Sequence, residues 1–233
     1  MYVSPFPILR AKPGYEASRL AGPASGRRKE YPERSRADSW AGCLLWFCLV
    51  RPFSSRMNRE KTMALREILI IGDPILTERA EPVAVIDQEI VRLARDMVET
   101  VHAAPGIGLA APQVGAGKRI IVVDLSVGQD AEALHVLVNP EIVAKEGESV
   151  CEEGCLSVPE VREKVARPYR VKVRGLDLEG RPVEVEGEDL LARALCHEID
   201  HLDGILFVEK LSALKRALIK KRFKKAAAAA KKA

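Results

Sequence analysis

The sequence predicts an α+β fold, in which antiparallel or mixed β-sheets pack around a central helix and a further helix ends the chain. Two observations indicate this class. Segments with strand-like patterns stand together in the middle of the chain, and segments with helical patterns lie apart from them. A doubly wound parallel sheet would instead alternate strands and helices regularly.

The first part of the chain differs from the rest in composition. Pro, Gly, Ser and Arg are scattered through residues 1–62 with no helical or strand period. Such a segment buries too little apolar surface to offset the entropy of ordering it. We therefore expect a poorly structured leader, with Met57 or Met63 as the natural start. The apolar run Trp40–Val50 is shorter than the roughly 20 residues that span a bilayer, so we expect no membrane association.

Regular patterns begin at Met63, which we expect to open a folded domain over residues 63–211. An apolar, strand-like run comes first and is closed by Gly72. Apolar side chains then recur at helical spacing over Ile90–Val101, and Asp87 is placed to cap this helix at its N-terminus.

Strands and one long helix are predicted next along the chain. The apolar runs Arg119–Leu125 and His135–Val143 are typical of buried strands, and the alternation on both sides of Glu179-Gly180 is typical of a hairpin. A helix is predicted over about Gly187–Asp203, because its pattern ends at Gly204, a residue type that often follows a helix. This is the central helix of the predicted fold.

The positive charge of the chain is concentrated at its C-terminal end. The formal net charge is +4, yet no acidic residue follows Glu209, whereas Lys and Arg are frequent in residues 212–233. We expect this basic tail to form a helix. In most proteins such a helix would simply be solvated and frayed, but a cationic helix can also bind a phosphate-rich partner.

The cysteines argue against a secreted, disulfide-stapled domain. Their number is odd and their spacing forms no even framework, which favours a reducing compartment. In that setting a cysteine near histidines is more often a ligand or a nucleophile. The five are Cys43, Cys48, Cys151, Cys155 and Cys196.

The predicted central helix carries the pattern H-E-x-x-H. His197 and His201 are four residues apart, so both imidazoles can face one metal ion from the same side of the helix. Glu198 lies about 100° around the helix, where it can reach a water on the metal and act as a general base. The alternative is a helix with two hydrogen-bonded core histidines. We favour a metal-binding helix.

A catalytic metal site needs a third protein ligand, and the sequence offers none downstream of the helix. Phe207 occupies the position at which one common protease pattern has a third histidine. Glu209 is the last acidic residue, and it stands too close to the helix. The third ligand should therefore come from upstream.

Four upstream residues are candidates: His102, His135, Cys151 and Cys155. His102 ends a predicted helix and His135 opens a predicted strand, so structural roles are expected for both. Cys155 lies in a short, irregular segment that can present a thiolate to a metal. Cys151 is its competitor and would otherwise be a small buried residue. We select Cys155.

Three motifs together resemble the peptide deformylases, which remove the formyl group from the N-terminal methionine of new bacterial proteins. They are GIGLAAPQ (Gly106–Gln113), EGCLS (Glu153–Ser157) and HEIDH (His197–His201), in this order. The resemblance covers about Met63 to Leu211. It implies one divalent metal per chain, held by Cys155, His197 and His201. It also implies Fe²⁺ as the physiological ion, with Zn²⁺, Ni²⁺ or Co²⁺ as substitutes.

The resemblance also implies catalytic roles. A metal-bound water would be the nucleophile, with Glu198 as general acid and base. The side-chain amide of Gln113 and the backbone N–H of Leu156 would stabilise the oxyanion. From the residues alone, Gln113 would be an exposed loop glutamine. Asp200, inside the helix motif, would support the metal ligands from behind.

The predicted substrate contacts lie in the first two motifs. Gly106 and Gly108 flank Ile107 in a run without bulk, where a peptide backbone can approach closely and pair as an added strand. Ile107 and Leu156 would line the apolar pocket for the formylmethionine side chain. Glu153 and Gly154, beside the third ligand, are also expected to bind substrate.

The expected partners are N-formylmethionyl nascent peptides and, through the basic tail, the ribosome. A cytoplasmic monomer is expected. Two rival functions remain from the residues themselves. A metallopeptidase would use the same helix motif but should have a further His or Glu ligand downstream. A ribosome- or RNA-binding module would hold its metal in a closed, purely structural site.

Overall fold

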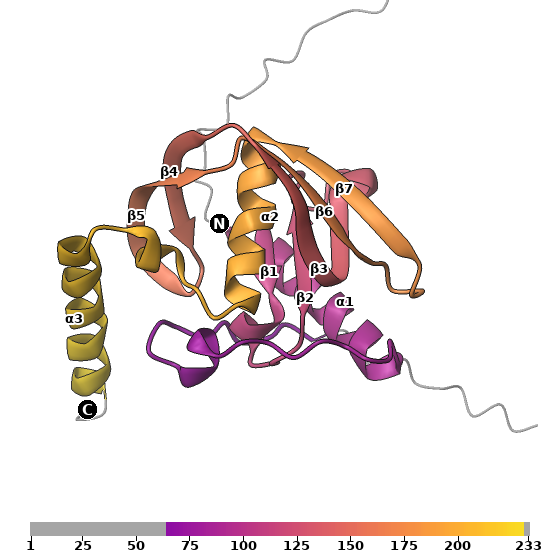
Figure 1. Ribbon diagram of the computed structural model, residues 1–233. Coiled ribbons are helices and arrows are strands. Elements are labelled where there is room, and N and C mark those ends of the chain that lie inside the picture. Colours follow the sequence, from indigo (N-terminus) through magenta and orange to yellow (C-terminus); the bar gives the residue numbers. More distant parts are fainter. Residues whose placement is uncertain (1–63, 231–233) are drawn as a thin grey trace, which may run out of the picture. The chain divides into compact units, whose positions relative to one another are not determined.

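The computed structural model describes residues 64–230 (Figure 1). The leader predicted for residues 1–62, its apolar run and the two suggested start positions lie outside this range. The helices and strands are α1 (Gln88–Ala103), β1 (Gly108–Ala110), β2 (Ile120–Asp124), β3 (Leu134–Glu146), β4 (Ser149–Cys155), β5 (Val158–Arg167), β6 (Arg170–Leu176), β7 (Pro182–Glu188), α2 (Asp189–Leu202) and α3 (Ala213–Ala230). Short 3-10 helices are η1 (Pro74–Thr77), η2 (Ala111–Val114), η3 (Ala131–Ala133) and η4 (Phe207–Lys210).

A five-stranded antiparallel sheet in the order β1-β2-β3-β6-β7 separates the two longer core helices. Successive side chains of a strand point to opposite faces, and β2 is buried on both. Ile121 and Val123 pack with α2, whereas Ile120 and Val122 pack with α1. The continuous apolar run of β2 therefore follows from its place between two helices.

Strands β4 and β5 form a separate two-stranded sheet, and α2 lies between it and the larger sheet (Figure 1). The prediction of an α+β fold with antiparallel sheets around a central helix is confirmed. Because α2 is enclosed on several sides, ten of its fourteen residues are buried. Among residues 64–230, no helix combines the length and apolar character that crossing a membrane requires.

The start of α1 and the end of α2 are formed as local chemistry predicts. The Asp87 carboxylate accepts hydrogen bonds from the backbone N–H groups of Glu89 and Ile90, at 2.9 and 3.0 Å, and so caps α1. After α2, Gly204 has φ +73°, and a Cβ there would lie 2.6 Å from the carbonyl oxygen of Thr77. A glycine is needed at this position both for the turn and for close packing.

Some local predictions are wrong. The apolar run before Gly72 forms no strand between Ala64 and Ile70; instead Leu69 N–H donates to Gln113 O and Ile71 N–H to Ser157 O, both at 2.8 Å. The run makes one backbone hydrogen bond to η2 and one to the turn between β4 and β5, so no ladder with a single strand forms.

The segment that carries Cys155 is a regular strand, where an irregular loop was predicted. Its register with β5 shifts between Gly154 and Cys155, which marks a β-bulge at the end of the hairpin. Cys151, expected to be buried if it was not a ligand, is exposed on β4. Leu190, in the first turn of α2, is 43% exposed.

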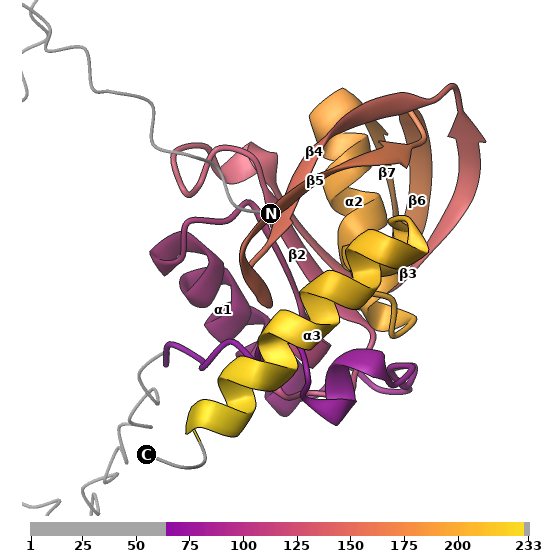
Figure 2. The ribbon, with the colours of Figure 1, turned by 90° about the vertical axis from the view of Figure 1, so that its left-hand side faces the viewer.

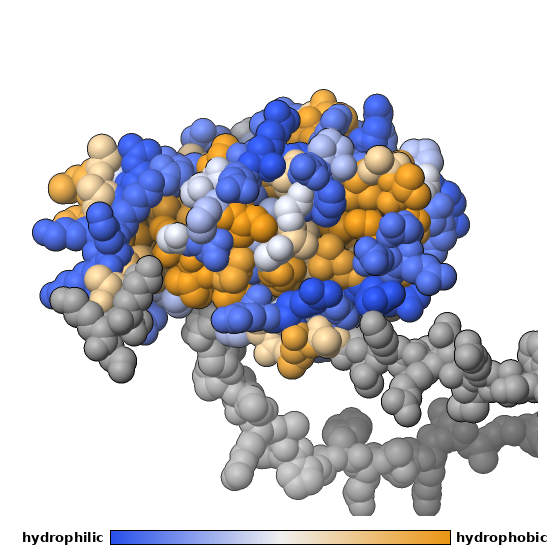
Figure 3. All heavy atoms as spheres, turned by 90° about the horizontal axis from the view of Figure 1, so that it is seen from below, coloured by the Kyte–Doolittle hydropathy of each residue, from blue (hydrophilic) through white to orange (hydrophobic). Residues whose placement is uncertain are grey.

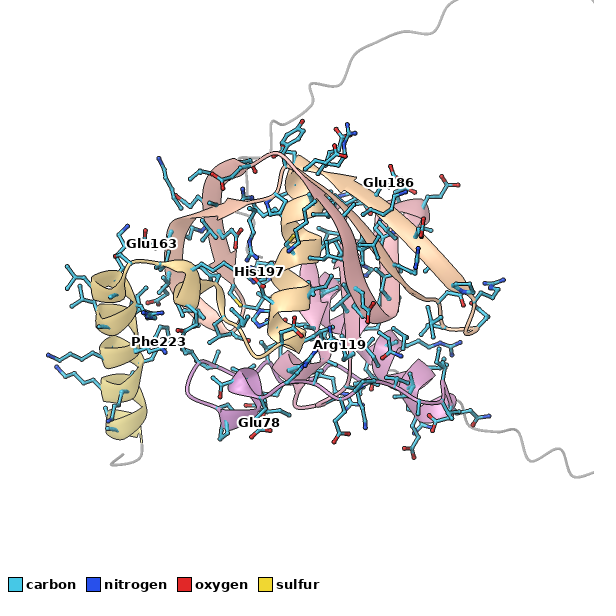
Figure 4. The ribbon with its side chains drawn as sticks, in the orientation of Figure 1. Glu78, Arg119, Glu163, Glu186, His197 and Phe223 are labelled. Atoms are coloured by element: carbon cyan, nitrogen blue, oxygen red, sulfur yellow. The ribbon has the colours of Figure 1, made fainter. Side chains whose placement is uncertain are left out.

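The predicted C-terminal helix is present as α3, which lies beside the β4–β5 sheet (Figure 2). Ile219 and Phe223 pack with apolar residues of the body, and Figure 4 shows Phe223 on the side of α3 that faces it. Several cations of α3 form ion pairs with body residues: Lys215 with Glu163, Arg216 and Lys220 with Glu209, and Arg222 with Glu160.

Candidate metal centre and active site

Helix α2 presents two buried imidazoles on one side. The rings of His197 and His201 are one helical turn apart, with centroids separated by 5.0 Å. Cys155, at the end of β4, places its Sγ 3.2 Å from Nε2 of His201. One possible ligand atom from each of the three residues lies within 4.8 Å of the others. The structure thus brings together the three residues selected from the sequence.

These residues fit a metal ion. Within the described part of the chain, the buried side-chain atoms without a hydrogen-bond partner are His197 Nε2, His201 Nδ1 and both carboxylate oxygens of Glu198. Buried polar atoms are rarely left unpaired, so four in one place indicate a missing ligand. One thiolate and two imidazole nitrogens form a donor set typical of Zn²⁺ and other first-row divalent metals.

The surroundings of Cys155 also favour the ionised form of its thiol. Burial of Cys155 by itself opposes loss of the proton, but the charge of His201, its hydrogen bond to the sulfur and the charge of His197 outweigh it. Together they hold the pKa of the thiol well below its usual range. A thiolate is the form of cysteine that binds a metal.

Glu198 lies directly against the first strand of the large sheet. Its side chain is fully buried, and a Cβ built on Gly108 would lie 2.4 Å from Glu198 Oε1. The absence of a side chain at Gly108 is therefore what admits the carboxylate. Because a Cβ points to a face of the sheet, Glu198 packs on the face of β1 that α2 covers, and β1 is the edge strand of that sheet.

Gln113 belongs to the site and is not an exposed loop residue. It lies in η2 and is 1% exposed. Its Oε1 accepts a hydrogen bond from Ala110 N–H at 2.8 Å. Its Nε2 lies 3.2 Å from Ser157 Oγ and 3.6 Å from Cys155 Sγ. The first contact fixes the amide so that its N–H groups face the sulfur ligand.

A buried carboxylate holds the first histidine. His197 Nδ1 donates to Glu153 Oε2 at 3.1 Å. Glu153 also accepts from Arg167 Nε at 2.8 Å, from Arg167 Nη2 at 3.0 Å and from Arg193 Nη1 at 2.7 Å. Both oxygens are thus occupied by protein groups. This arrangement favours a supporting role for Glu153 over the substrate contact predicted from the sequence.

The two arginines were not found by sequence reasoning. Arg193 stands four residues before His197, so the helical spacing that paired the histidines could have placed it on the same face. Arg167 has no such signal, because it reaches the site from the far end of β5. It also forms an ion pair with Asp200, which in turn contacts Lys210 Nζ at 3.0 Å. Asp200 therefore supports the ligands indirectly, through Arg167.

The other upstream candidates lie away from the three ligands. His102 donates to Asp124 at 2.7 Å, and His135 lies on β3, paired with Val123. Cys151 is exposed, four residues before Cys155 on the same strand. Figure 4 shows His197 on α2 beside the β4–β5 sheet, which supplies the sulfur.

A cleft of about 690 Å³ opens next to Cys155. Gly154 and Leu156, both predicted to contact substrate, line it together with Pro105, Pro159, Val161 and Arg162. Gly106, Ile107 and Gly108 are buried at the start of β1. Of the predicted substrate contacts, Gly154 and Leu156 therefore line the cleft, whereas Gly106, Ile107 and Gly108 are not among its lining residues and Glu153 bonds to His197.

A Cys–His–His cluster beside a buried, unpaired glutamate defines the class of metal-dependent hydrolases that activate water. The particular family follows from comparison with known proteins. The family model for polypeptide deformylase matches residues 65–217. The chain belongs to this family, and the resemblance found in the three motifs is confirmed.

Individual relatives support the same family assignment. The chain is 50% identical over 163 residues to the peptide deformylase of Acidobacterium capsulatum, covering 70% of this chain and 96% of that protein. A crystal structure of a peptide deformylase from Legionella pneumophila is 45% identical, covers 71% of this chain and 98% of its own, and has a TM-score of 0.66. The peptide deformylase of Synechococcus elongatus in complex with actinonin is 40% identical and covers 67% of this chain and 86% of its own, with a TM-score of 0.64.

Proposed function

We propose that this chain removes the formyl group from the N-terminal formylmethionine of nascent polypeptides and releases formate, using Glu198 for proton transfer. One observation carries the proposal. The unpaired carboxylate of Glu198 comes from the helix that carries His197 and His201, and it packs against Gly108 of β1, a strand at the edge of the sheet. A formyl peptide paired with that edge would bring its scissile bond to the acid–base group.

Cys155, His197 and His201 would hold one divalent cation. We propose Fe²⁺ as the physiological ion, with Zn²⁺, Ni²⁺ or Co²⁺ able to replace it in the same donor set. Such a cation activates water for attack and polarises the formyl carbonyl. The Glu153 carboxylate orients His197 by accepting its Nδ1–H, so that Nε2 is the nitrogen left for the metal.

In the reaction, the oxygen of water adds to the formyl carbon and the carbon–nitrogen bond breaks. Glu198 takes one proton from the attacking water and delivers it to the leaving nitrogen, which departs as the free amine. The other proton stays on the formic acid, which carries the new oxygen and ionises to formate when it is released. The place of Glu198 in a water-poor site suits this role, because no other protein group competes for its two oxygens.

Gln113 and Leu156 would stabilise the negative charge that develops on the formyl oxygen. The Gln113 amide is held rigidly by Ala110, and its N–H groups face Cys155. The backbone N–H of Leu156 follows the same sulfur ligand in the chain. Preorganised donors of this kind need no rearrangement at the moment of reaction.

The peptide would bind as an additional strand on β1. Edge strands leave backbone groups unpaired, and an extended peptide can satisfy them. Gly106, Ile107 and Gly108 would supply this edge, while Ile107 and Leu156 would line the pocket for the methionine side chain. Gly154 would contact the peptide from the opposite wall of the cleft.

Helix α3 would draw the enzyme to the ribosome, where its substrates emerge. Among residues 64–230, Lys221, Lys224 and Lys225 form no ion pair, whereas the other cations of α3 are held by body carboxylates. Figure 3 shows hydrophilic and apolar residues side by side at the left, where α3 lies. Three uncompensated ammonium groups would bind phosphate electrostatically. The enzyme would act in the cytoplasm as a monomer.

Formate release from formyl-Met-Ala-Ser tests the activity. Glu198→Gln, which keeps the shape of the side chain but removes the base, should lower kcat by about 10²–10⁴. Glu148→Gln, at an exposed glutamate, should leave it unchanged. Cleavage of casein without formate release would favour the metallopeptidase. Inactivity in both assays, with the metal still bound, would favour a structural metal site.

A further inference from the structure

A buried aspartate outside the metal centre accepts four hydrogen bonds from three residues. Asp124 ends β2, and its side chain is 1% exposed. His102, in the last turn of α1, donates from Nε2 to Asp124 Oδ2 at 2.7 Å. Gly128 N–H donates to the same oxygen at 2.8 Å, and Ser126 donates to Oδ1 from its backbone at 2.8 Å and its hydroxyl at 2.6 Å. The carboxylate is therefore fixed in one orientation.

The same aspartate also holds the chain on the far side of a short connection. Its backbone N–H donates to the carbonyl oxygen of Ile107 at 2.9 Å. His102 lies in the last turn of α1, and Ile107 is the last residue of the connection between α1 and β1. One residue, Asp124, thus holds the chain at both ends of this connection, residues 104–107, by two separate groups.

The loop after β2 holds the histidine ring from another side. Gly128 has φ +81°, and a Cβ there would lie 3.2 Å from Nδ1 of His102. Any larger residue would press on the ring. His102 is therefore held between this loop and Asp124, although 27% of its side chain is exposed.

The connection reaches the active site through Pro105. This proline is exposed and lines the cleft beside Cys155, as do Val161 and Arg162 of β5. Two backbone bonds support it from within, Ala104 N–H to Thr100 O at 3.0 Å and Gly106 N–H to Ala104 O at 2.8 Å. The position of Pro105 therefore depends on the contacts that anchor the connection at its two ends.

We propose that His102 and Asp124 are positioning residues, which fix the Pro105 wall of the cleft and so set the affinity for the peptide part of the substrate. The proposal rests on the proposed function and deepens it. Neither residue touches the reacting atoms, since His102 and Asp124 contact each other and the β2 loop. Their loss should therefore weaken substrate binding and leave the chemical step nearly intact.

The test compares kinetic constants of the metal-loaded enzyme with formyl-Met-Ala-Ser. His102→Phe keeps a ring but removes the donor to Asp124. It should raise KM about tenfold, as expected for losing a hydrogen bond to a charged group, and change kcat by less than about twofold. His102→Gln, which retains an N–H donor at a similar distance, should restore most of the affinity.

Asp96→Asn provides a matched control. Asp96 is another buried aspartate, 3% exposed, on the same helix α1, where it accepts hydrogen bonds from Arg66 and from Ala64 N–H. It makes no contact with the connection. Its loss should lower stability without changing KM.

Hydrogen exchange supplies a readout that does not depend on activity. In His102→Phe the amides of Ala104 and Gly106 should exchange faster, and in Asp96→Asn they should not. An unchanged KM in His102→Phe, or an equal rise in Asp96→Asn, would overturn the proposal. If the unmodified enzyme releases no formate, the proposed function fails. The exchange rates would still decide whether His102 and Asp124 hold the connection between α1 and β1 in place. Should His102→Phe not fold, Ser126→Ala should show the same changes more weakly.

Discussion

Gly108 and Glu198 lie so close that a Cβ on the glycine would stand 2.4 Å from a carboxylate oxygen. An edge strand and a catalytic helix are thus packed together at the atom that would transfer the proton. The contact links two motifs that are ninety residues apart in the sequence. It also makes the glycine a requirement of the site and not only of the strand.

Gly108→Ala should therefore displace the Glu198 carboxylate. We expect kcat for formate release to fall by about 10²-fold or more, because a misplaced acid–base group loses much of its effect. Gly117→Ala is the matched control, since a Cβ there meets nothing within 4 Å. A Gly108→Ala enzyme with normal kcat would show that Glu198 need not lie where the structure has it.

Gln113→Ala should remove a donor from the oxyanion site. We expect kcat to fall by about 10²–10³, which corresponds to about 2.7–4 kcal/mol of lost transition-state stabilisation, with little change in KM. Gln129→Ala, at an exposed glutamine in the loop after β2, should behave like the unmodified enzyme. If kcat is retained in Gln113→Ala, the amide only supports η2 and Cys155.

Glu153→Gln should weaken metal binding. The substitution keeps the size of the side chain but removes the charge that orients His197, and such losses typically lower metal affinity about 10–100-fold. Competition with a chelator, using Co²⁺ or Zn²⁺, measures this directly. Glu152→Gln, at the exposed neighbouring residue, should bind metal normally. Equal affinities in both variants would contradict the role given to Glu153.

Asp124→Asn should change how stability depends on pH. Burial opposes ionisation of Asp124, but its hydrogen bonds outweigh burial and lower the pKa to about 2. A lowered pKa in the folded state means that the stabilisation is fully present above pH 3.8 and is lost as the pH falls from 3.8 towards 2. The shift corresponds to about 2 kcal/mol.

Urea unfolding of both proteins at the same metal concentration tests this. The difference in unfolding free energy between the unmodified protein and Asp124→Asn should be largest near pH 6 and should shrink below pH 4. A difference that stays constant between pH 6 and pH 3 would show that the carboxylate charge contributes nothing.

Replacement of Lys221, Lys224 and Lys225 by Ala should weaken ribosome binding without changing turnover of a short formyl peptide. Losing three phosphate contacts should reduce the salt dependence of binding by a slope of roughly 2–3. Truncation after Leu211 should abolish salt-sensitive binding altogether. Lys172→Ala is the control, because it removes a lysine from the β6–β7 surface and not from α3, and it should leave ribosome binding unchanged. Unchanged binding after truncation would exclude α3 as the contact.

The sequence by itself determined what depends on residues close together in the chain. The Asp87 cap, the stop at Gly204 and the one-turn spacing of His197 and His201 all follow from helix geometry, and each is present in the structure. The β6–β7 hairpin also follows from local alternation and a tight turn. The family was recognisable from three short motifs, because each is local as well.

Only the tertiary structure decided what depends on distant segments meeting. No local pattern indicates that Arg167, at the end of β5, joins Arg193 of α2 on Glu153. The run before Gly72 looks like a strand, but it lacks a neighbouring strand with which to form a ladder. Hydrogen bonds and ion pairs between distant residues form only once the chain has folded, so their partners cannot be deduced from the spacing of residues along it.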